Sequence, residues 1–263
     1  MSGTAWDPDQ YQRYRGYRDR PALDLMVQLP GDLEPATVWD LGCGTGEHAA
    51  VLAARHPNCT VYGLDSSPDM LERARQTRAR VEWVQGDIAT FAPPVSPDLI
   101  FTNAALQWVP DHGVLFPRLA GLLAPGGVFA CQMPMSFAEP WHHVMREVAE
   151  RGPWAPRLRD VRGVQPVLPT ADYHRLLAPF GETDIWTTTY LHELTGQDPV
   201  VDWMKGTGLR PYLSRLTDPG EQADFLRAYA EALRPLFPQQ PDGVTLFPFP
   251  RLFLLLRRGG HGV

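Results

Sequence analysis

The first half of the chain alternates short apolar runs with amphipathic segments. Five segments have the length and residue pattern of strands, namely residues 36–41, 59–64, 81–85, 98–102 and 128–133. Between them, apolar residues recur at helical spacing in residues 47–55, after Ser67, and in residues 114–123. Ser67 and Pro68 are also typical of a helix start. This alternation predicts an α/β fold with a mostly parallel, doubly wound sheet covered by helices on both faces.

The second half does not continue the alternation. Helical spacing at residues 144–150 is followed by several prolines before residue 170, which favours an irregular or helical cap. A strand-like segment at 183–191 interrupts the cap, and a helical pattern at 221–236 precedes a last apolar strand within 244–258. We therefore expect one domain, residues 1–263, with an N-terminal lid and leading helix (1–30), a core (31–134), a cap (135–215) and a C-terminal helix and strand (216–263).

The leading helix is predicted over residues 22–29. Leu23, Met26 and Val27 fall at helical spacing there, and Pro30 ends the pattern.

Composition supports a folded chain and excludes several classes of protein. Apolar residues make up 44% and charged residues 21%, so the chain can bury a sizeable core. Lys and Arg number 24 against 30 Asp and Glu, and the net charge of −6 argues against a strongly basic nucleic-acid binder. The first 20 residues are polar, and no run of about 18 apolar residues occurs. We expect a cytoplasmic protein without a membrane partner.

Cysteine and histidine give no metal signature. The three cysteines, Cys43, Cys59 and Cys131, are far apart and form no CxxC pair, so neither a zinc module nor a disulfide framework is expected. His142 and His143 are adjacent on a predicted helix and would point about 100° apart, which disfavours a shared metal. We predict no metal site.

The first strand ends in a glycine turn with the spacing GxGxG, at Gly42, Gly44 and Gly46. A dinucleotide fingerprint would place its last glycine where Glu47 stands, which disfavours an NAD-dependent dehydrogenase. A glycine turn at this place lets the backbone approach a bound nucleoside, and Asp40 just before it suits an ammonium group. Taken alone, the pattern is equally typical of a simple turn.

Polar residues at the next three strand ends strengthen the interpretation. Asp65 can accept hydrogen bonds from both ribose hydroxyls, as expected for an acid 23 residues beyond Gly42. Asp87 can accept from an adenine amino group while Ile88 covers the ring, and Asn103 ends the fourth strand at the same edge of the sheet. Each of these residues could also end its strand for local reasons. Together they favour a nucleoside-bearing cofactor.

With these features the chain resembles the class I S-adenosylmethionine-dependent methyltransferases, whose Rossmann-like fold carries an antiparallel C-terminal strand and a helical cap insertion. Segments along almost the whole chain are similar to the trans-aconitate methyltransferase family, at residues 103–112, 132–134, 145–148, 184–186, 207–211 and 249–253. Gly-Leu-Arg-Pro at 208–211 and Phe-Pro-Arg-Leu-Phe at 249–253 are the discriminating segments. The resemblance implies S-adenosylmethionine as cofactor, S-adenosylhomocysteine as product, residues 31–134 as the cofactor-binding core, and Ser66 and Met70 as further cofactor contacts.

The implied reaction needs positioning rather than a catalytic residue. Carboxyl groups are ionised at neutral pH because their pKa lies near ~4, so in-line attack on the methyl group requires no general base. Arg210 and Arg251 are the candidates for holding a polycarboxylate, since a guanidinium matches a carboxylate with two hydrogen bonds. The alternatives are a surface ion pair for Arg210 and a strand-edge cap for Arg251.

Further substrate contacts are expected from Gln107, Trp108 and His112, which follow the fourth strand, and from Gln132. Gln107 and His112 would donate hydrogen bonds and Trp108 would form a wall, although Trp108 could equally be a core aromatic. Tyr11 would belong to the lid, or else be an ordinary surface aromatic.

Several functions remain open at this point. The leading hypothesis is methylation of trans-aconitate to its monomethyl ester by a monomer that acts on a small polycarboxylate. Alternatives are another small or carrier-bound carboxylate, such as a malonyl group, and a non-catalytic protein that binds S-adenosylmethionine.

Overall fold

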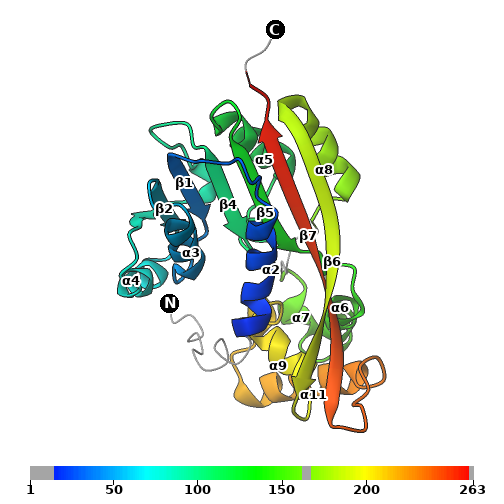
Figure 1. Cartoon of the computed structure of the whole chain (residues 1–263). Coiled ribbons are helices and arrows are strands. Elements are labelled where there is room, and N and C mark those ends of the chain that lie inside the picture. The colour runs from blue at the N-terminus through cyan, green and yellow to red at the C-terminus, as the bar shows by residue number, and fades with distance from the viewer. Residues whose placement is uncertain (1–14, 162–166, 261–263) are drawn as a thin grey trace. The chain divides into compact units, whose positions relative to one another are not determined.

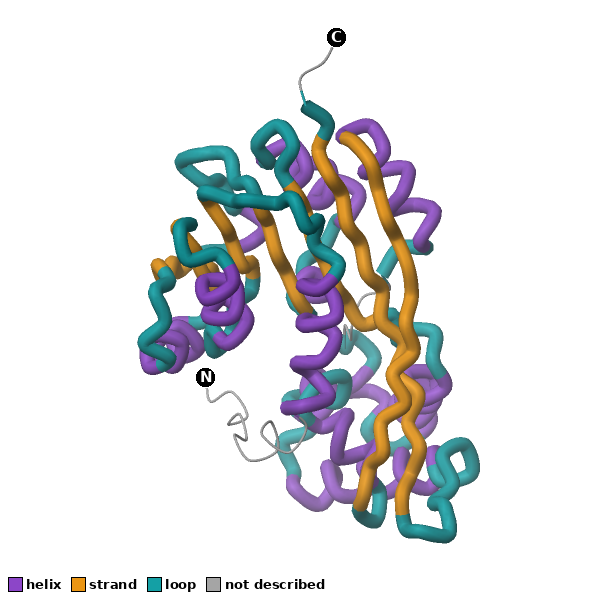
Figure 2. Tube along the Cα trace, in the orientation of Figure 1, coloured by secondary structure: helices purple, strands orange, loops and turns teal. Residues whose placement is uncertain are grey.

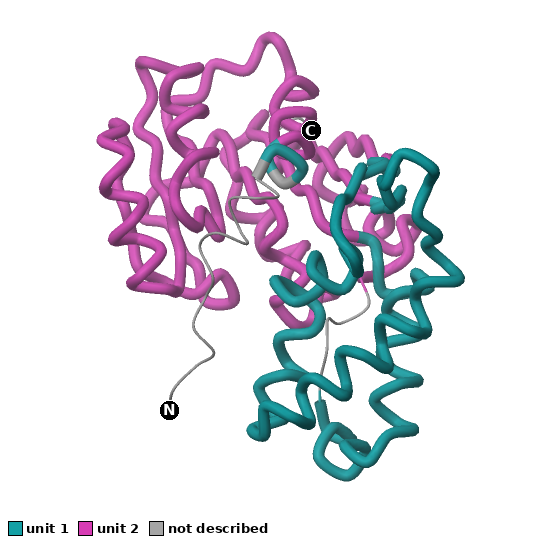
Figure 3. The backbone as a smooth tube through the Cα atoms, turned by 90° about the horizontal axis from the view of Figure 1, so that it is seen from below, with its two compact units in different colours: residues 1–19, 135–166, 189–250 teal, residues 20–134, 167–188, 251–263 magenta. Residues whose placement is uncertain are grey.

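The computed structural model describes residues 15–161 and 167–260 of the chain (Figure 1). These residues form two compact units, coloured separately in Figure 3. The helical unit contains residues 15–19, 135–161 and 189–250. The sheet unit contains residues 20–134, 167–188 and 251–260.

Seven strands form one sheet in the order β3-β2-β1-β4-β5-β7-β6, and Figure 2 shows them side by side. Their bounds are Thr37–Leu41 (β1), Thr60–Asp65 (β2), Glu82–Gln85 (β3), Leu99–Asn103 (β4), Val128–Pro134 (β5), Gly181–Thr195 (β6) and Val244–Arg258 (β7). Strands β1 to β5 pair in parallel, and β7 pairs antiparallel to β5. The predicted α/β fold, mostly parallel with an antiparallel C-terminal strand, is confirmed.

Three helices of the sheet unit follow the predicted pattern, whereas the fourth, at Thr170–Leu177, lies within the segment expected to form the cap. These helices are α3 (Glu47–Arg55), α4 (Pro68–Gln76), α5 (His112–Leu122) and α8 (Thr170–Leu177), with short 3-10 turns η1 (Ile88–Thr90), η2 (Leu106–Trp108) and η3 (Ala178–Phe180). Helix α4 begins as the sequence predicts: Ser67 Oγ accepts a hydrogen bond from the Met70 amide at 3.4 Å, and Pro68 follows at the first helical position. The predicted strand at 183–191 is longer than expected, because β6 runs from Gly181 to Thr195.

The leading helix differs from its prediction in extent and in its buried face. Helix α2 spans Arg15–Val27, so it begins seven residues before the predicted start at residue 22. Leu23 and Val27, expected on the apolar face, are exposed, whereas Ala22 and Leu25 are buried. The buried face differs because residues 22, 25, 26 and 29 fit the helical repeat as well as the predicted set does. The start differs because the first turn of the helix is mostly polar, so no apolar spacing marks it in the sequence.

The helical unit is built from α6 (Pro140–Arg151), α7 (Ala155–Leu158), α9 (Pro199–Lys205), α10 (Arg210–Leu213) and α11 (Pro219–Leu233). Its core is aromatic. Trp141 of α6 is fully buried and stacks on Phe249, with ring centroids 5.7 Å apart. The Tyr229 hydroxyl of α11 donates a hydrogen bond to the Trp141 carbonyl at 3.0 Å. This unit is therefore mainly helical and carries a hydrophobic core of its own.

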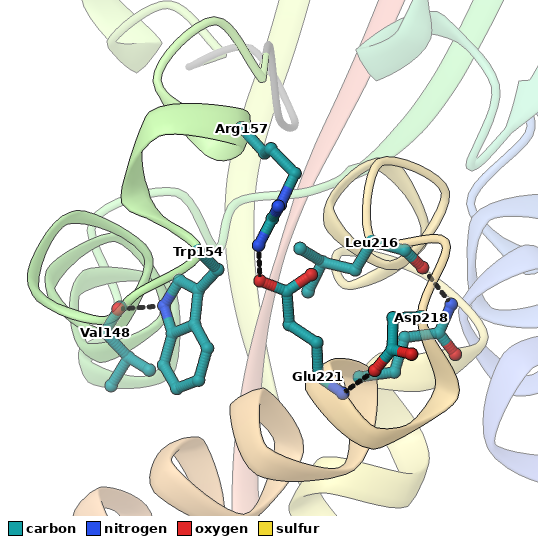
Figure 4. Close-up of polar contacts among 7 residues, drawn as sticks. Val148, Trp154, Arg157, Leu216, Asp218 and Glu221 are labelled. Carbon is teal, nitrogen blue, oxygen red and sulfur yellow. Dashed lines mark hydrogen bonds and ion pairs between the residues drawn. The ribbon is translucent and has the colours of Figure 1, made fainter.

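Hydrogen bonds and an ion pair connect α7 and the residue before it to α6 and α11, as Figure 4 shows. Trp154 Nε1, just before α7, donates a hydrogen bond to the Val148 carbonyl of α6 at 2.7 Å. Arg157 of α7 forms an ion pair with Glu221 in the first turn of α11. Asp218 caps α11 by accepting the Glu221 amide at 2.8 Å. Three helices of this unit are thus tied together by side chains as well as by apolar packing.

Trp83 of β3 packs directly over two glycines of the sheet unit. A Cβ atom at Gly63 would lie 2.5 Å from Trp83 Cζ3, and one at Gly46 would lie 2.5 Å from Trp83 Cη2. Real Cβ atoms do not approach carbon atoms this closely. The indole ring therefore requires glycine at both positions, and it packs against the last glycine of the turn, Gly46.

Replacing Gly63 with Ala should lower the free energy of unfolding by about 1 to 3 kcal/mol, because the added methyl group displaces the Trp83 ring. Gly113→Ala in α5 is the control, since a Cβ atom there would meet nothing within 4 Å. Urea unfolding measures both variants. Equal midpoints for the two variants would contradict the packing of Trp83.

Within residues 15–161 and 167–260, no helix combines the length and the apolar character needed to span a membrane.

Candidate functional site

The glycine turn after β1 has a backbone that few other residues adopt. Gly42, Gly44 and Gly46 have φ angles of 75°, 55° and 86°, in the left-handed region that favours glycine. The amides of Gly42 and Cys43 donate to the Leu64 carbonyl at 2.8 and 3.0 Å, which fixes the turn against the end of β2. A Cβ atom at Gly42 would lie 2.4 Å from the Ala105 Cβ, whereas one at Gly44 would meet nothing within 4 Å. The turn is therefore closely packed at Gly42 and open at Gly44.

Asp65, the last residue of β2, holds this turn. Its Oδ2 atom accepts a hydrogen bond from the Gly44 amide and its Oδ1 atom one from the Ser67 amide, both at 2.9 Å. Each carboxylate oxygen has a second lone pair, so Asp65 can still accept from two hydroxyls. Ser66 beside it is exposed and Met70 is half-buried.

Asp87 and Ile88 lie after β3, next to the same turn. Asp87 is exposed, and its Oδ1 atom caps η1 by accepting the Ala89 amide at 2.8 Å. Ile88 is buried, and its Cδ1 atom is 3.6 Å from where a Cβ atom of Gly42 would be. An apolar side chain and a carboxylate thus adjoin the turn, as the binding of an adenine ring would require.

Asp40 is a buried acid with an unsatisfied oxygen. Its side chain is 1% exposed, and among the described residues its Oδ2 atom has no hydrogen-bond partner. Burial raises the pKa of Asp40 to about 7; the charge of His48 opposes this rise, and that of Asp65 adds to it. A buried carboxylate of this kind is stabilised by a cation placed against it, such as an ammonium group.

The strand register places three polar side chains on one face of the sheet. Asn103 of β4 is directly opposite Gln132 of β5, and Gln132 is opposite Phe253 of β7. Arg251 is two residues from Phe253, so it projects from the same face, diagonal to Gln132. Asn103, Gln132 and Arg251 therefore lie together near the ends of β4 and β5. Asp40 shares their face because its partner Phe101 is two residues before Asn103.

Gln132 is the least satisfied of these side chains. It is fully buried, and neither its amide oxygen nor its amide nitrogen has a hydrogen-bond partner among the described residues. The same holds for the Asn103 Oδ1 atom. A buried polar group without a partner costs about 1 to 3 kcal/mol, so the side chains of Gln132 and Asn103 are candidates for hydrogen bonds to a bound molecule.

Gln107, Trp108 and His112, predicted to contact the substrate, follow β4, and the structure fits these predictions only in part. Gln107 is buried, with its Nε2 atom donating to the Ala104 carbonyl at 2.7 Å and its Oε1 atom unpaired among the described residues. Trp108 is 53% exposed, so the alternative of a core aromatic is wrong.

The prediction that His112 donates a hydrogen bond to the substrate is wrong. Its Nδ1 atom bonds the Tyr173 hydroxyl at 2.6 Å and its Nε2 atom the Leu106 carbonyl at 2.9 Å. Burial lowers the pKa of His112, so the ring is neutral: Nε2 donates to Leu106, and Nδ1 accepts from Tyr173. No ring nitrogen is left to donate to a substrate. Tyr173 is 61 residues further along the chain, and no local pattern pointed to it.

The two predicted arginines belong to different units. Arg251 is 4% exposed on β7, which lies between β5 and β6, so the alternative of a strand-edge cap is wrong. Arg210 is the exposed first residue of α10 in the helical unit, and within residues 15–161 and 167–260 it forms no ion pair. Tyr11 lies outside the described residues.

Comparison with known proteins identifies the family. The family described as a methyltransferase domain matches residues 38–127. A trans-aconitate 2-methyltransferase of Methylobacterium radiotolerans is 47% identical over 96% of this chain and 98% of its own length. The corresponding proteins of Azoarcus and Escherichia coli are 45% and 43% identical over 96% of this chain and 99% and 98% of their own lengths.

Solved structures support the fold. A putative sarcosine dimethylglycine methyltransferase from Galdieria sulphuraria matches 97% of this chain and 92% of its own, with a TM-score of 0.56 and 19% identity. The phosphoethanolamine N-methyltransferase 2 of Haemonchus contortus, in complex with S-adenosyl-L-methionine, matches 91% of this chain and 52% of its own, with a TM-score of 0.54 and 15% identity. The fold is therefore that of the class I methyltransferases. By its near-full-length identity to the curated enzymes, the chain belongs to the trans-aconitate 2-methyltransferase family.

Proposed function

We propose that this protein transfers a methyl group from S-adenosylmethionine to one carboxylate of trans-aconitate, giving the monomethyl ester and S-adenosylhomocysteine. The observation that carries the proposal is identity of 43 to 47% over 96% of the chain to proteins named for this activity. The polar side chains at the ends of the parallel strands support it, because ligands of open α/β sheets bind at this edge.

The residues around the glycine turn fit the cofactor. The unsatisfied oxygen of Asp40 suits the ammonium group, and the free lone pairs of Asp65 suit the ribose hydroxyls. Asp87 and Ile88 suit the adenine, and Gly42, Gly44, Gly46, Ser66, Met70 and Asn103 complete the proposed cofactor contacts. S-adenosylmethionine would supply a methyl group bound to a positively charged sulfur: as the acceptor oxygen bonds to the methyl carbon, the carbon–sulfur bond breaks and the sulfur leaves as the neutral thioether of S-adenosylhomocysteine.

The chain has to hold and orient the acceptor acid. The acceptor carboxylate is already ionised at neutral pH, so no residue of the chain need remove a proton. Arg251 and Gln132, with Arg210, Gln107 and Trp108, are the proposed acceptor contacts, and Tyr11 remains a proposed lid residue. Arg251 can fix one carboxylate with two hydrogen bonds, while the buried amide of Gln132 can satisfy another oxygen. Orientation of the two reactants can contribute on the order of 7 to 11 kcal/mol.

We also propose that the protein acts as a cytoplasmic monomer on a small polycarboxylate, with no nucleic-acid or membrane partner. The net charge of −6 supports the exclusion of nucleic acid. Sedimentation of the purified protein tests the monomer, and a dimer at working concentration would contradict it.

The function is tested with purified protein and S-adenosylmethionine labelled in its methyl group. The acceptors are trans-aconitate, citrate, fumarate and a malonyl-loaded carrier protein. We expect trans-aconitate to have the highest kcat/KM and its product to be a monomethyl ester by mass spectrometry. A higher kcat/KM for the malonyl carrier would favour the carrier-bound alternative. Cofactor binding without transfer to any acid would favour a non-catalytic protein.

Cofactor affinity should depend on pH through Asp40. The pKa of this buried acid is raised to about 7, so below that pH the side chain is mostly protonated before binding. An ammonium group favours the ionised form, and binding then releases a proton. The affinity for S-adenosylhomocysteine should therefore rise with pH, by up to about tenfold per unit below the pKa.

Titration calorimetry across this pH range measures the effect, and Asp40→Asn is expected to remove it. A wild-type affinity that does not change with pH would contradict the role of Asp40.

A further inference from the structure

Arg146 of α6, in the helical unit, is a half-buried cation held in a fixed position. Its guanidinium carbon lies 4.4 Å from the centre of the Phe137 ring, and its Nη1 atom donates to the Phe137 carbonyl at 3.2 Å. A guanidinium has five N–H donors, and this contact uses one of them. The ring and the carbonyl therefore orient the group while leaving donors for another acceptor.

No carboxylate of the described residues forms an ion pair with Arg146. The next acid on α6, Glu147, is 3.3 Å from His143 and 3.6 Å from Arg151. Glu150, one turn further along the helix, is exposed and forms no ion pair with Arg146. In a protein with a net charge of −6, a half-buried cation that has no counterion in the described part of the chain is a good binding group for an anionic ligand.

The surroundings of Arg146 include the helix that begins with Arg210. A Cβ atom at Gly208, just before α10, would lie 2.9 Å from the His142 ring, so α6 packs closely on this turn. Burial raises the pKa of the Tyr212 hydroxyl in α10; the charge of Arg146 opposes this rise, and that of Glu150 adds to it. Burial, together with the Arg146 charge, lowers the pKa of His142 to about 4, so this neighbouring ring is neutral at physiological pH. Arg146 thus adds positive charge to the part of the helical unit that carries Arg210.

We propose that Arg146 binds a carboxylate of the acceptor acid and makes the enzyme prefer acids with three carboxylates over acids with two. The proposal rests on the proposed function. Only one carboxylate of the acceptor acid accepts the methyl group. The other carboxylates stay negatively charged, and because the protein is acidic overall, nearby cations are needed to bind them. The Phe137 contacts orient Arg146 in advance, so little side-chain freedom is lost on binding.

The test compares Arg146→Gln and Arg146→Lys with the wild type. Arg151→Gln is the control, because Arg151 is an exposed arginine of the same helix that pairs with Glu147. The measurements are the KM for trans-aconitate, the dissociation constant of S-adenosylhomocysteine, and the inhibition constants of tricarballylate and of glutarate, which lacks the central carboxylate.

Arg146→Gln should raise the KM for trans-aconitate and the inhibition constant of tricarballylate by about tenfold to a hundredfold. The inhibition constant of glutarate and the affinity for S-adenosylhomocysteine should change little. Arg146→Lys should recover part of the loss, and Arg151→Gln should behave as the wild type.

If Arg146→Gln weakens inhibition by tricarballylate and by glutarate equally, or weakens neither, Arg146 does not have the proposed role. The proposed function would still stand in that case, provided that the wild type methylates trans-aconitate. Failure of the wild type to methylate trans-aconitate would overturn both.

Discussion

Arg251→Gln is expected to raise the KM for trans-aconitate by about a hundredfold or more, while the dissociation constant of S-adenosylhomocysteine stays within about twofold. Arg251 is 4% exposed and shares a sheet face with Gln132, whose amide is buried and unsatisfied among the described residues. Glutamine keeps hydrogen-bonding capacity but loses the charge and the planar fork that bind a carboxylate. Initial-rate kinetics and calorimetry with S-adenosylhomocysteine measure the two quantities.

Arg257→Gln is the matched control for this experiment. Arg257 is on the same strand, but it is exposed and forms an ion pair with Asp32, with contacts of 2.7 and 3.1 Å. A surface pair of this kind contributes about 0 to 1 kcal/mol, so its loss should affect neither constant. If Arg251→Gln weakens acceptor and cofactor binding equally, the arginine is not an acceptor contact.

Asp65→Ala is expected to weaken the binding of S-adenosylhomocysteine by about a hundredfold or more. The change removes the proposed acceptors for the ribose hydroxyls and, at the same time, the hydrogen bonds that hold the Gly44 and Ser67 amides at 2.9 Å. Asp69→Ala, an exposed acid in the first turn of α4, is the control.

Asp65→Asn separates the two effects of the first variant. Its amide oxygen can still accept one backbone hydrogen bond, so the turn should be less disturbed while the ribose contact is still weakened. Calorimetry measures affinity, and urea unfolding measures the turn's contribution to stability. An affinity unchanged in both Asp65 variants would show that the ribose contact is misplaced.

The core of the fold could be predicted because its signals are local. Strands β1, β2, β4 and β5 contain short apolar runs, and a glycine, aspartate or asparagine at or just after the ends of β1 to β4 marks those ends directly in the sequence. Gly42 and Asp65 are adjacent in the fold because parallel strands share one carboxyl edge, so their positions along the chain already predict that they meet.

What could not be predicted depends on contacts between distant residues. The bond between His112 and Tyr173 joins two helices 61 residues apart, and it leaves His112 without a free nitrogen. The alternative of a strand-edge cap for Arg251 is excluded only by the strand order, which places β7 between β5 and β6. The buried, unsatisfied amide of Gln132 also depends on the pairing of β4, β5 and β7. Apolar spacing in α2 fitted two faces of the helix, and only packing selects between them.

The most direct test of the account is a crystal structure of the protein with S-adenosylhomocysteine and trans-aconitate together. The account predicts ribose hydroxyls on the Asp65 carboxylate and the carboxylates of the acid within hydrogen-bond distance of Gln132 and Arg251. A nucleoside absent from the glycine turn, or an acid bound away from both side chains, would contradict it.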